Sequence, residues 1–143
     1  DNIVAYWVPD TLPPPGAPLD FTYRLQWQGA RIAQQPPGAW VTQSRVGRGY
    51  RELAEDEQQF MVDFSGPSLA ALPAGAPIKA VVSAPVNGEI LETNAYPVEA
   101  TGAWRMMVLV KQLDAAQPVE LRGYLQHGDD VLTETWSNLV PPR

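Results

Sequence analysis

The stretch Leu19-Asp-Phe-Thr-Tyr-Arg-Leu-Gln-Trp-Gln28 alternates apolar and polar side chains without interruption. Successive side chains of a β-strand point to opposite faces, so this pattern predicts a strand with one dry and one wet face. A helix would scatter the same apolar residues around its circumference. Because antiparallel sheets commonly have one solvated face, we interpret the stretch as the wall of an antiparallel sandwich. This interpretation assigns Tyr23 and Trp27 to the core.

Composition limits the classes of function that remain open. The chain has 143 residues, a formal net charge of −6 and no cysteine. A negative net charge argues against a general binder of nucleic acid or of anionic membranes. The lack of cysteine excludes a disulfide framework, a thiol nucleophile and a cysteine zinc site. No apolar run approaches the roughly 18 residues of a membrane span, and no motif implies a cofactor.

The first residues indicate that the domain of interest begins some way into the chain. Residue 1 is Asp, and a strand-like run over residues 2–8 begins at once. The proline-rich stretch Leu12–Pro18 then reads as a stiff linker. We therefore expect a domain boundary near residues 9–17: residues 1–16 would be a connector, or the last strand of a missing N-terminal domain, and residues 17–143 would form one β-sandwich domain. The alternative is that the proline-rich stretch is an ordinary loop between two strands.

Short alternating runs separated by turn residues continue to the end of the chain. Pro67 is suited to the first position of a short helical turn. Asn87-Gly88 lies between two extended runs, which is a strong hairpin signal. We expect about seven to nine short strands in an all-β, immunoglobulin-like antiparallel sandwich of the E-set type. The predicted strands are Trp40–Val46, Phe60–Phe64, Ile78–Ala84, Glu89–Ala95, Trp104–Val110, Val119–Gln126 and Val131–Asn138.

The residues that could perform chemistry do not form a convincing active site. Asp129 and Asp130 are the best pair of carboxylates for glycoside hydrolysis, but adjacent residues of a turn rarely converge on one bond. The single histidine, His127, precedes them in the same turn and lacks partners for a metal or a serine triad. The acidic run over residues 52–57 has neither the spacing nor the glycine of a calcium loop. We therefore expect no metal ion and no other cofactor, and consider a self-contained hydrolase the least favoured function.

One surface stretch combines aromatic and guanidinium groups, Trp40-Val-Thr-Gln-Ser-Arg-Val-Gly-Arg-Gly-Tyr-Arg51. Aromatic rings stack on the apolar faces of sugars, and arginines hydrogen-bond hydroxyl groups or pair with carboxylates. The alternative is that the rings are core or edge residues and that the arginines pair with the acids that follow. The candidate contacts to a glycan or to a partner subunit are Trp40, Arg45, Arg48 and Tyr50.

Five blocks of sequence follow one another along the chain: Asp1–Pro9, Pro18–Trp27, Thr42–Gly49, Phe60–Pro67 and Glu134–Pro142. Together, and in this order, they resemble the periplasmic glucan biosynthesis proteins of the G and D types. The resemblance extends over essentially the whole chain and corresponds to the C-terminal part of a longer family protein.

This resemblance implies a two-domain periplasmic protein that serves the synthesis or trimming of β-1,2-linked glucans. Its N-terminal domain would hold the glucan cleft and the acidic catalytic residues, so no catalytic residue is carried over to this chain. The implied partners are that N-terminal domain and β-glucan, with a homodimer as a further candidate. The expected function is a non-catalytic C-terminal immunoglobulin-like module. The alternatives are an independent carbohydrate-binding module and the self-contained hydrolase.

Overall fold

The protein was analysed as a computed structural model that describes residues 6, 9–25, 27, 35, 37–49, 52–73, 75–84 and 86–143. The chain divides into two compact units, residues 1–33 and residues 34–143. The regular secondary structure of the described residues lies in the second unit, and it is almost entirely β. This confirms the predicted fold class, an all-β antiparallel sandwich.

The first sheet has four strands that pair in the order β1-β2-β5-β4, all antiparallel. A register shift between Val41 and Gln43 bends the edge strand β1, and a second shift between Ile90 and Glu92 bends the other edge strand, β4. Such irregularities are frequent at sheet edges, where they discourage further pairing. The strands are β1 (Trp40–Gly47), β2 (Glu57–Ser65), β5 (Ala103–Gln112) and β4 (Gly88–Val98).

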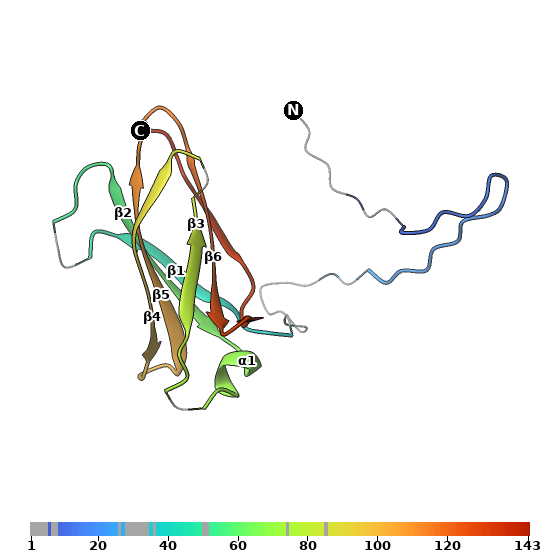
Figure 1. Cartoon of the computed structure of the whole chain (residues 1–143), viewed down its shortest axis with the longest axis horizontal. Helices are drawn as coiled ribbons and strands as arrows, with labels where there is room; N and C mark the ends of the chain where they lie inside the picture. The colour runs from blue at the N-terminus through green and yellow to red at the C-terminus, as the bar shows by residue number, and fades with distance from the viewer. Residues whose placement is uncertain are drawn as a thin grey trace. The chain divides into compact units, whose positions relative to one another are not determined.

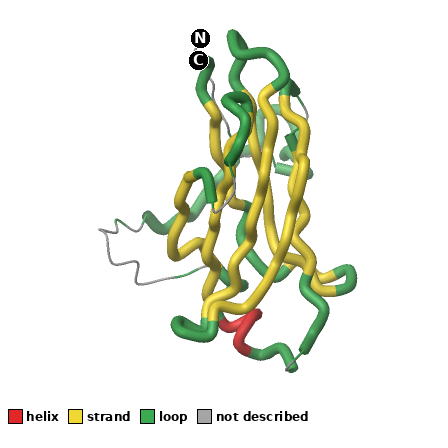
Figure 2. Tube along the Cα trace, turned by 90° about the vertical axis from the view of Figure 1, so that its left-hand side faces the viewer, coloured by secondary structure: helices red, strands yellow, loops and turns green. Residues whose placement is uncertain are grey.

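The second sheet is built around β6 (Val119–His127), which pairs on one side with β3 (Lys79–Ser83). Two short strands, β7 (Asp130–Val131) and β8 (Trp136–Val140), pair with opposite ends of β6. A single helical turn, α1 (Pro67–Ala70), follows β2 and lies at one end of the sandwich (Figures 1 and 2). Pro67 is at the start of this turn, as predicted, since proline lacks an N–H that a helix start would leave unpaired.

The core lies between the two sheets and follows from alternation along the strands. Every second residue of β2, β5 and β6 points inward, and each of these buried side chains contributes about 1.5–3 kcal/mol of stability. The predicted inward residues of β5 and β6 are confirmed. The largest fully buried side chains are Phe64, Met106, Leu121, Leu125, Val62, Val108, Val110, Val119 and Val140.

The outer face of the first sheet carries a second, smaller apolar cluster. Met107 and Leu109 of β5 point outward, yet both are buried because Leu53 of the loop before β2 covers them. Met61 and Tyr96 pack against this group. The cluster explains why both faces of β5 are apolar, whereas a strand of a two-layer sandwich usually has one polar face in contact with solvent.

The hairpin predicted at Asn87-Gly88 is wrong, because the strands on either side belong to different sheets. Asn87 does adopt the left-handed conformation expected of a turn residue, with φ 60°. Its side chain, however, serves a crossover between the sheets. The amide nitrogen donates to the carbonyl oxygens of Asp114 and Gln117 at 2.9 and 2.8 Å, and Asp114 N donates to Asn87 Oδ1 at 2.6 Å. The dipeptide thus specifies the turn but not the pairing partner.

The strand predicted at Leu19–Gln28 is also wrong for the residues that the structure describes. Residues 19–25 and 27 belong to no strand, and their apolar side chains are exposed. The exposed fraction is 77% for Tyr23 and 93% for Trp27. Alternation determines which side chains would share a face, but a strand also needs a partner for its backbone groups and a cover for its apolar face. The assignment of Tyr23 and Trp27 to the core is therefore corrected for this chain.

Candidate functional site: a groove between two edge strands

The most site-like feature of the described residues is a groove between β1 and β8, which are edge strands of opposite sheets. Trp136 of β8 bridges the two strands at one end, where its Nε1 donates to Ser44 Oγ at 3.1 Å. Its ring packs against Phe60 at a centroid distance of 5.4 Å and an angle of 57°. Beyond this bridge, residues of both strands line a cavity.

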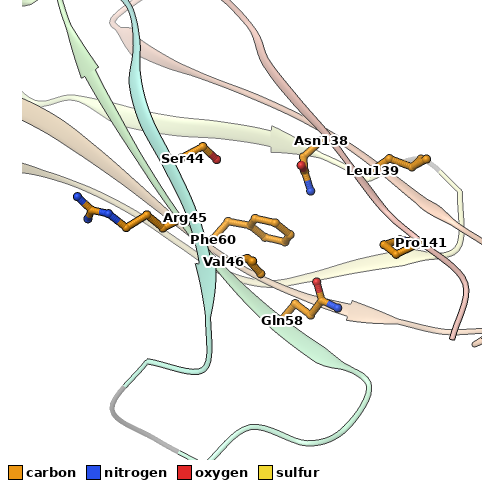
Figure 3. A pocket seen from close by; sticks show the side chains of 8 residues that line it. All are labelled: Ser44, Arg45, Val46, Gln58, Phe60, Asn138, Leu139 and Pro141. Carbon is orange, nitrogen blue, oxygen red and sulfur yellow. The ribbon is translucent and has the colours of Figure 1, made fainter.

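The groove consists of two adjoining cavities, of about 300 and 310 Å³, which share Val46 and Gln58. We call the pair the β1–β8 groove. The first cavity is lined by Ser44, Arg45, Val46, Gln58, Phe60, Asn138, Leu139 and Pro141 (Figure 3), and the second by Val46, Gly47, Arg48, Glu55, Glu57, Gln58 and Arg143.

The side chains that face the first cavity are neutral. Figure 3 shows the side chain of Arg45 pointing away from the others. Its guanidinium hydrogen-bonds Gln43 and lies 4.0 Å from the carboxylate of Asp63. The amides of Gln58 and Asn138 remain, and neither has a hydrogen-bond partner within the described part of the chain. The first cavity therefore offers amide donors and acceptors beside apolar surface.

The second cavity is charged and more firmly built. The side chain of Arg143 donates from Nε to Gln112 Oε1 at 3.0 Å and from NH1 to the Glu55 carbonyl at 2.6 Å. Glu57 Oε2 accepts a hydrogen bond from Ala54 N at 3.3 Å. Arg48 lines the same cavity and is exposed. Guanidinium groups hydrogen-bond hydroxyl and carboxylate oxygens, so this end favours a ligand rich in oxygen.

The four contact residues predicted from the sequence separate in the structure. Trp40 is half-buried at the start of β1, where it is the register partner of Ser65. Arg45 and Arg48 both lie along the groove, but only Arg48 remains without an acidic partner among the described residues. Tyr50 lies outside the described residues. The sequence reasoning did not identify Gln58, Asn138 or Arg143, because isolated amides and a terminal arginine carry no local signal.

The predicted turn that contains the single histidine forms as expected. His127 pairs with Asp130 across the turn between β6 and β7, and His127 Nδ1 lies 2.9 Å from the Pro77 carbonyl oxygen. Asp129 and Asp130 are exposed. Within the described ranges, no group of three His, Cys, Asp or Glu side chains is arranged to hold a metal ion. In the same ranges no helix is long and apolar enough to cross a membrane.

The outer face of the first sheet carries an ion pair between Asp63, which is buried, and Arg105, which is partly buried. The Nε of Arg105 donates to Asp63 Oδ1 at 2.6 Å, and its NH2 donates to Oδ2 at 2.8 Å. These hydrogen bonds raise the pKa of Arg105 further above its ordinary value, so the guanidinium remains charged. Asp63 is 6% exposed and both its oxygens are occupied.

Comparison with known proteins places the chain in a family. A family model described as "Periplasmic glucan biosynthesis protein, MdoG" matches residues 1–140. A "Glucans biosynthesis protein G" of Ralstonia nicotianae is 46% identical over 149 aligned positions, which cover 99% of this chain and 29% of the relative. Proteins of the same name from Pectobacterium atrosepticum and Pectobacterium carotovorum are 41% and 40% identical, and the match covers 99% of this chain and 28% of each relative.

The chain spans less than a third of the length of these relatives. Its match to the family model nevertheless runs through almost every residue, including the strands that form the groove. The chain therefore belongs to the periplasmic glucan biosynthesis (MdoG) family.

Proposed function

We propose that residues 34–143 are a non-catalytic, immunoglobulin-like C-terminal module of a protein that makes or trims β-1,2-linked glucans in the periplasm. Membership of the family supports a role in the synthesis or trimming of glucans. The sandwich core, which is formed by residues of this unit alone, supports a module that folds by itself. The proposed partner is the larger part of the same protein, since the relatives are more than three times as long as this chain.

The observation that carries the non-catalytic assignment is the state of Asp63. It is the only buried carboxylate among the described residues, and Arg105 occupies both of its oxygens. Glycoside hydrolysis needs one carboxyl that can donate a proton, usually because burial raises its pKa, and a second carboxylate across the bond. The acids that line cavities, among them Glu52, Glu55 and Glu57, are exposed or half-exposed.

Incubation of the purified chain with β-1,2-glucan tests this assignment. We expect no release of new reducing ends at a chain concentration at which a full-length family glucanase degrades the polymer. Release that disappears in the Glu57→Gln variant would overturn the non-catalytic assignment. Deletion of residues 34–143 from the full-length protein tests the stabilising role, and we expect the Tm of the remaining part to fall. An unchanged Tm would contradict that role.

We also propose that residues 1–33 belong structurally with the rest of the full-length protein. Their apolar stripe is exposed in this chain at Leu19, Phe21, Tyr23, Leu25 and Trp27. An uninterrupted stripe of this size is unusual on an isolated domain and is typical of a surface that another part covers. The alternating pattern fits a strand added to a sheet elsewhere in the protein. The predicted boundary near residues 9–17 would then move to residue 33.

A further inference from the structure

We propose that the β1–β8 groove is a binding site for a short stretch of a neutral glucan chain. This inference rests on the proposed function, because the family context supplies the class of ligand. It adds a sugar site on the module itself, lined, apart from Phe60, by side chains that lie outside the sandwich core.

The first cavity matches the surface of a pyranose ring. Sugar rings present apolar C–H faces together with hydroxyl groups that both donate and accept hydrogen bonds. Val46, Leu139 and Pro141 provide apolar walls, and Val46 and Leu139 are 63% and 59% exposed. The amides of Gln58 and Asn138 can each donate and accept. A volume of about 300 Å³ is at the small end of ligand sites, which suits a single ring better than a long segment.

The second cavity offers space for the next sugar ring of the glucan. It shares Val46 and Gln58 with the first cavity, so the two cavities adjoin at these side chains. Arg48 and Arg143 line it, and guanidinium groups donate several hydrogen bonds to hydroxyl oxygens. Arg143 is already oriented by Gln112 and by the Glu55 carbonyl. A second sugar ring would therefore meet a partly preorganised donor.

The amides of the groove have no structural task that would explain them. The side-chain amides of Gln58 and Asn138 make no hydrogen bond within the described part of the chain, although both residues are only half-exposed. By contrast, the buried Gln112 donates from Nε2 to the carbonyls of Gln117 and Pro141 at 2.7 and 3.3 Å. Two such amides that face one cavity can donate hydrogen bonds to, and accept them from, the hydroxyl groups of a sugar.

Nuclear magnetic resonance of the whole chain during titration with β-1,2-linked glucose oligomers tests the proposal. We expect saturable shifts of the side-chain amides of Gln58 and Asn138 and of the backbone amides of residues 44–48. Oligomers that reach the second cavity should bind more tightly than glucose alone. The variant Gln58→Ala/Asn138→Ala should raise Kd at least about tenfold. The variant Arg48→Ala should raise Kd only for the oligomers that are long enough to reach the second cavity.

The matched control is Gln59→Ala. Gln59 is the next residue of β2 and, by alternation, points to the other face of the sheet, toward Gly49. This variant should leave Kd unchanged. Shifts that cluster outside the groove, or an equal loss of binding in the control, would overturn the proposal. So would a complete lack of shifts at millimolar sugar. Because the assignment as a non-catalytic module is tested by hydrolysis and by the Tm of the full-length protein, a failure here leaves it standing.

Discussion

Arg105 and Asp63 lie directly opposite each other on β5 and β2 and are joined by two hydrogen bonds, of 2.6 and 2.8 Å. The neighbouring pair on the same face is Met61 with Met107, which belongs to the outer apolar cluster. The ion pair thus lies beside an apolar patch, where water solvates it poorly. A bidentate pair in such a place fixes the register of the two strands as well as contributing energy.

Removal of one member of this pair should destabilise the chain. In Asp63→Ala the guanidinium of Arg105 loses both acceptors while it remains partly buried. We expect the free energy of unfolding to fall by about 2–3 kcal/mol, between the values for exposed and fully buried pairs. The measurement is urea denaturation of the purified chain. The double variant Asp63→Ala/Arg105→Met should lose less than the sum of the two single variants.

The matched control for this pair is Glu120 with Arg122. These residues also form a close ion pair, at 2.6 Å, but both side chains are more than half exposed. Glu120→Ala should therefore change the free energy of unfolding by less than about 0.5 kcal/mol. Equal losses for Glu120→Ala and Asp63→Ala would show that partial burial gives the Asp63–Arg105 pair no added importance.

Asn87 should be sensitive to substitution for two separable reasons. Asn87→Ala removes the hydrogen bonds to the loop of residues 114–117 and places alanine at φ 60°. With about 1 kcal/mol for the backbone and about 1 kcal/mol for each of the three net hydrogen bonds, we expect a loss of about 4 kcal/mol. Asn87→Gly keeps the backbone conformation accessible and should lose about 1 kcal/mol less. Equal stability of Asn87→Gly and the natural chain would mean that the side-chain bonds contribute nothing.

Asn94→Ala serves as the control for Asn87. Asn94 lies on the edge strand β4 and is exposed, and among the described residues its Oδ1 accepts a hydrogen bond only from the adjacent Ala95 N, at 2.8 Å. Its loss should change the stability by less than about 0.5 kcal/mol.

The sequence was sufficient to predict those strands whose alternating faces are covered within the chain itself. The inward residues of β5 and β6 illustrate this, because period-two burial follows from strand geometry alone. The sequence was insufficient where the structure of a segment depends on which other strand pairs with it or which other residues cover it. The alternation at Leu19–Gln28 is as regular as any, but nothing in it specifies which edge or core completes the strand. Asn87-Gly88 likewise specifies a backbone conformation and not a pairing.

The groove was only partly predictable for the same reason. Arg45 and Arg48 were predicted as contact residues because they lie near aromatic residues in the sequence, and both line the groove. Asn138 is 80 residues from Gln58 in the numbering, and the two share a cavity only because the edge strands β1 and β8 of the two sheets lie beside each other. A cavity between edge strands depends on how the sheets stack, which no local pattern records.

Tyr23→Ala and Trp27→Ala should leave the stability of this chain unchanged, because both rings are already exposed. We expect a change in the free energy of unfolding of less than about 0.5 kcal/mol. Phe64→Ala, which removes a fully buried ring, should cost about 3–5 kcal/mol in the same assay. In the full-length protein the first two variants should become destabilising, since we propose that another part covers them. No effect there would contradict the proposed placement of residues 1–33.

Gly66 joins β2 to α1 and should tolerate no side chain. Its φ of 157° lies in a region that residues with a Cβ rarely adopt, and an added Cβ would lie 2.5 Å from Ala39 Cα and 2.6 Å from the Gly38 carbonyl oxygen. Backbone atoms cannot rotate away as a flexible side chain can, so we expect Gly66→Ala to cost at least about 3 kcal/mol. Gly47→Ala is the control, because nothing lies within 4 Å of the added atom. It should change the stability by less than about 0.5 kcal/mol. Thermal and urea denaturation of both variants would measure the difference, and similar stabilities would show that the segment from Gly38 to Ala39 can move aside.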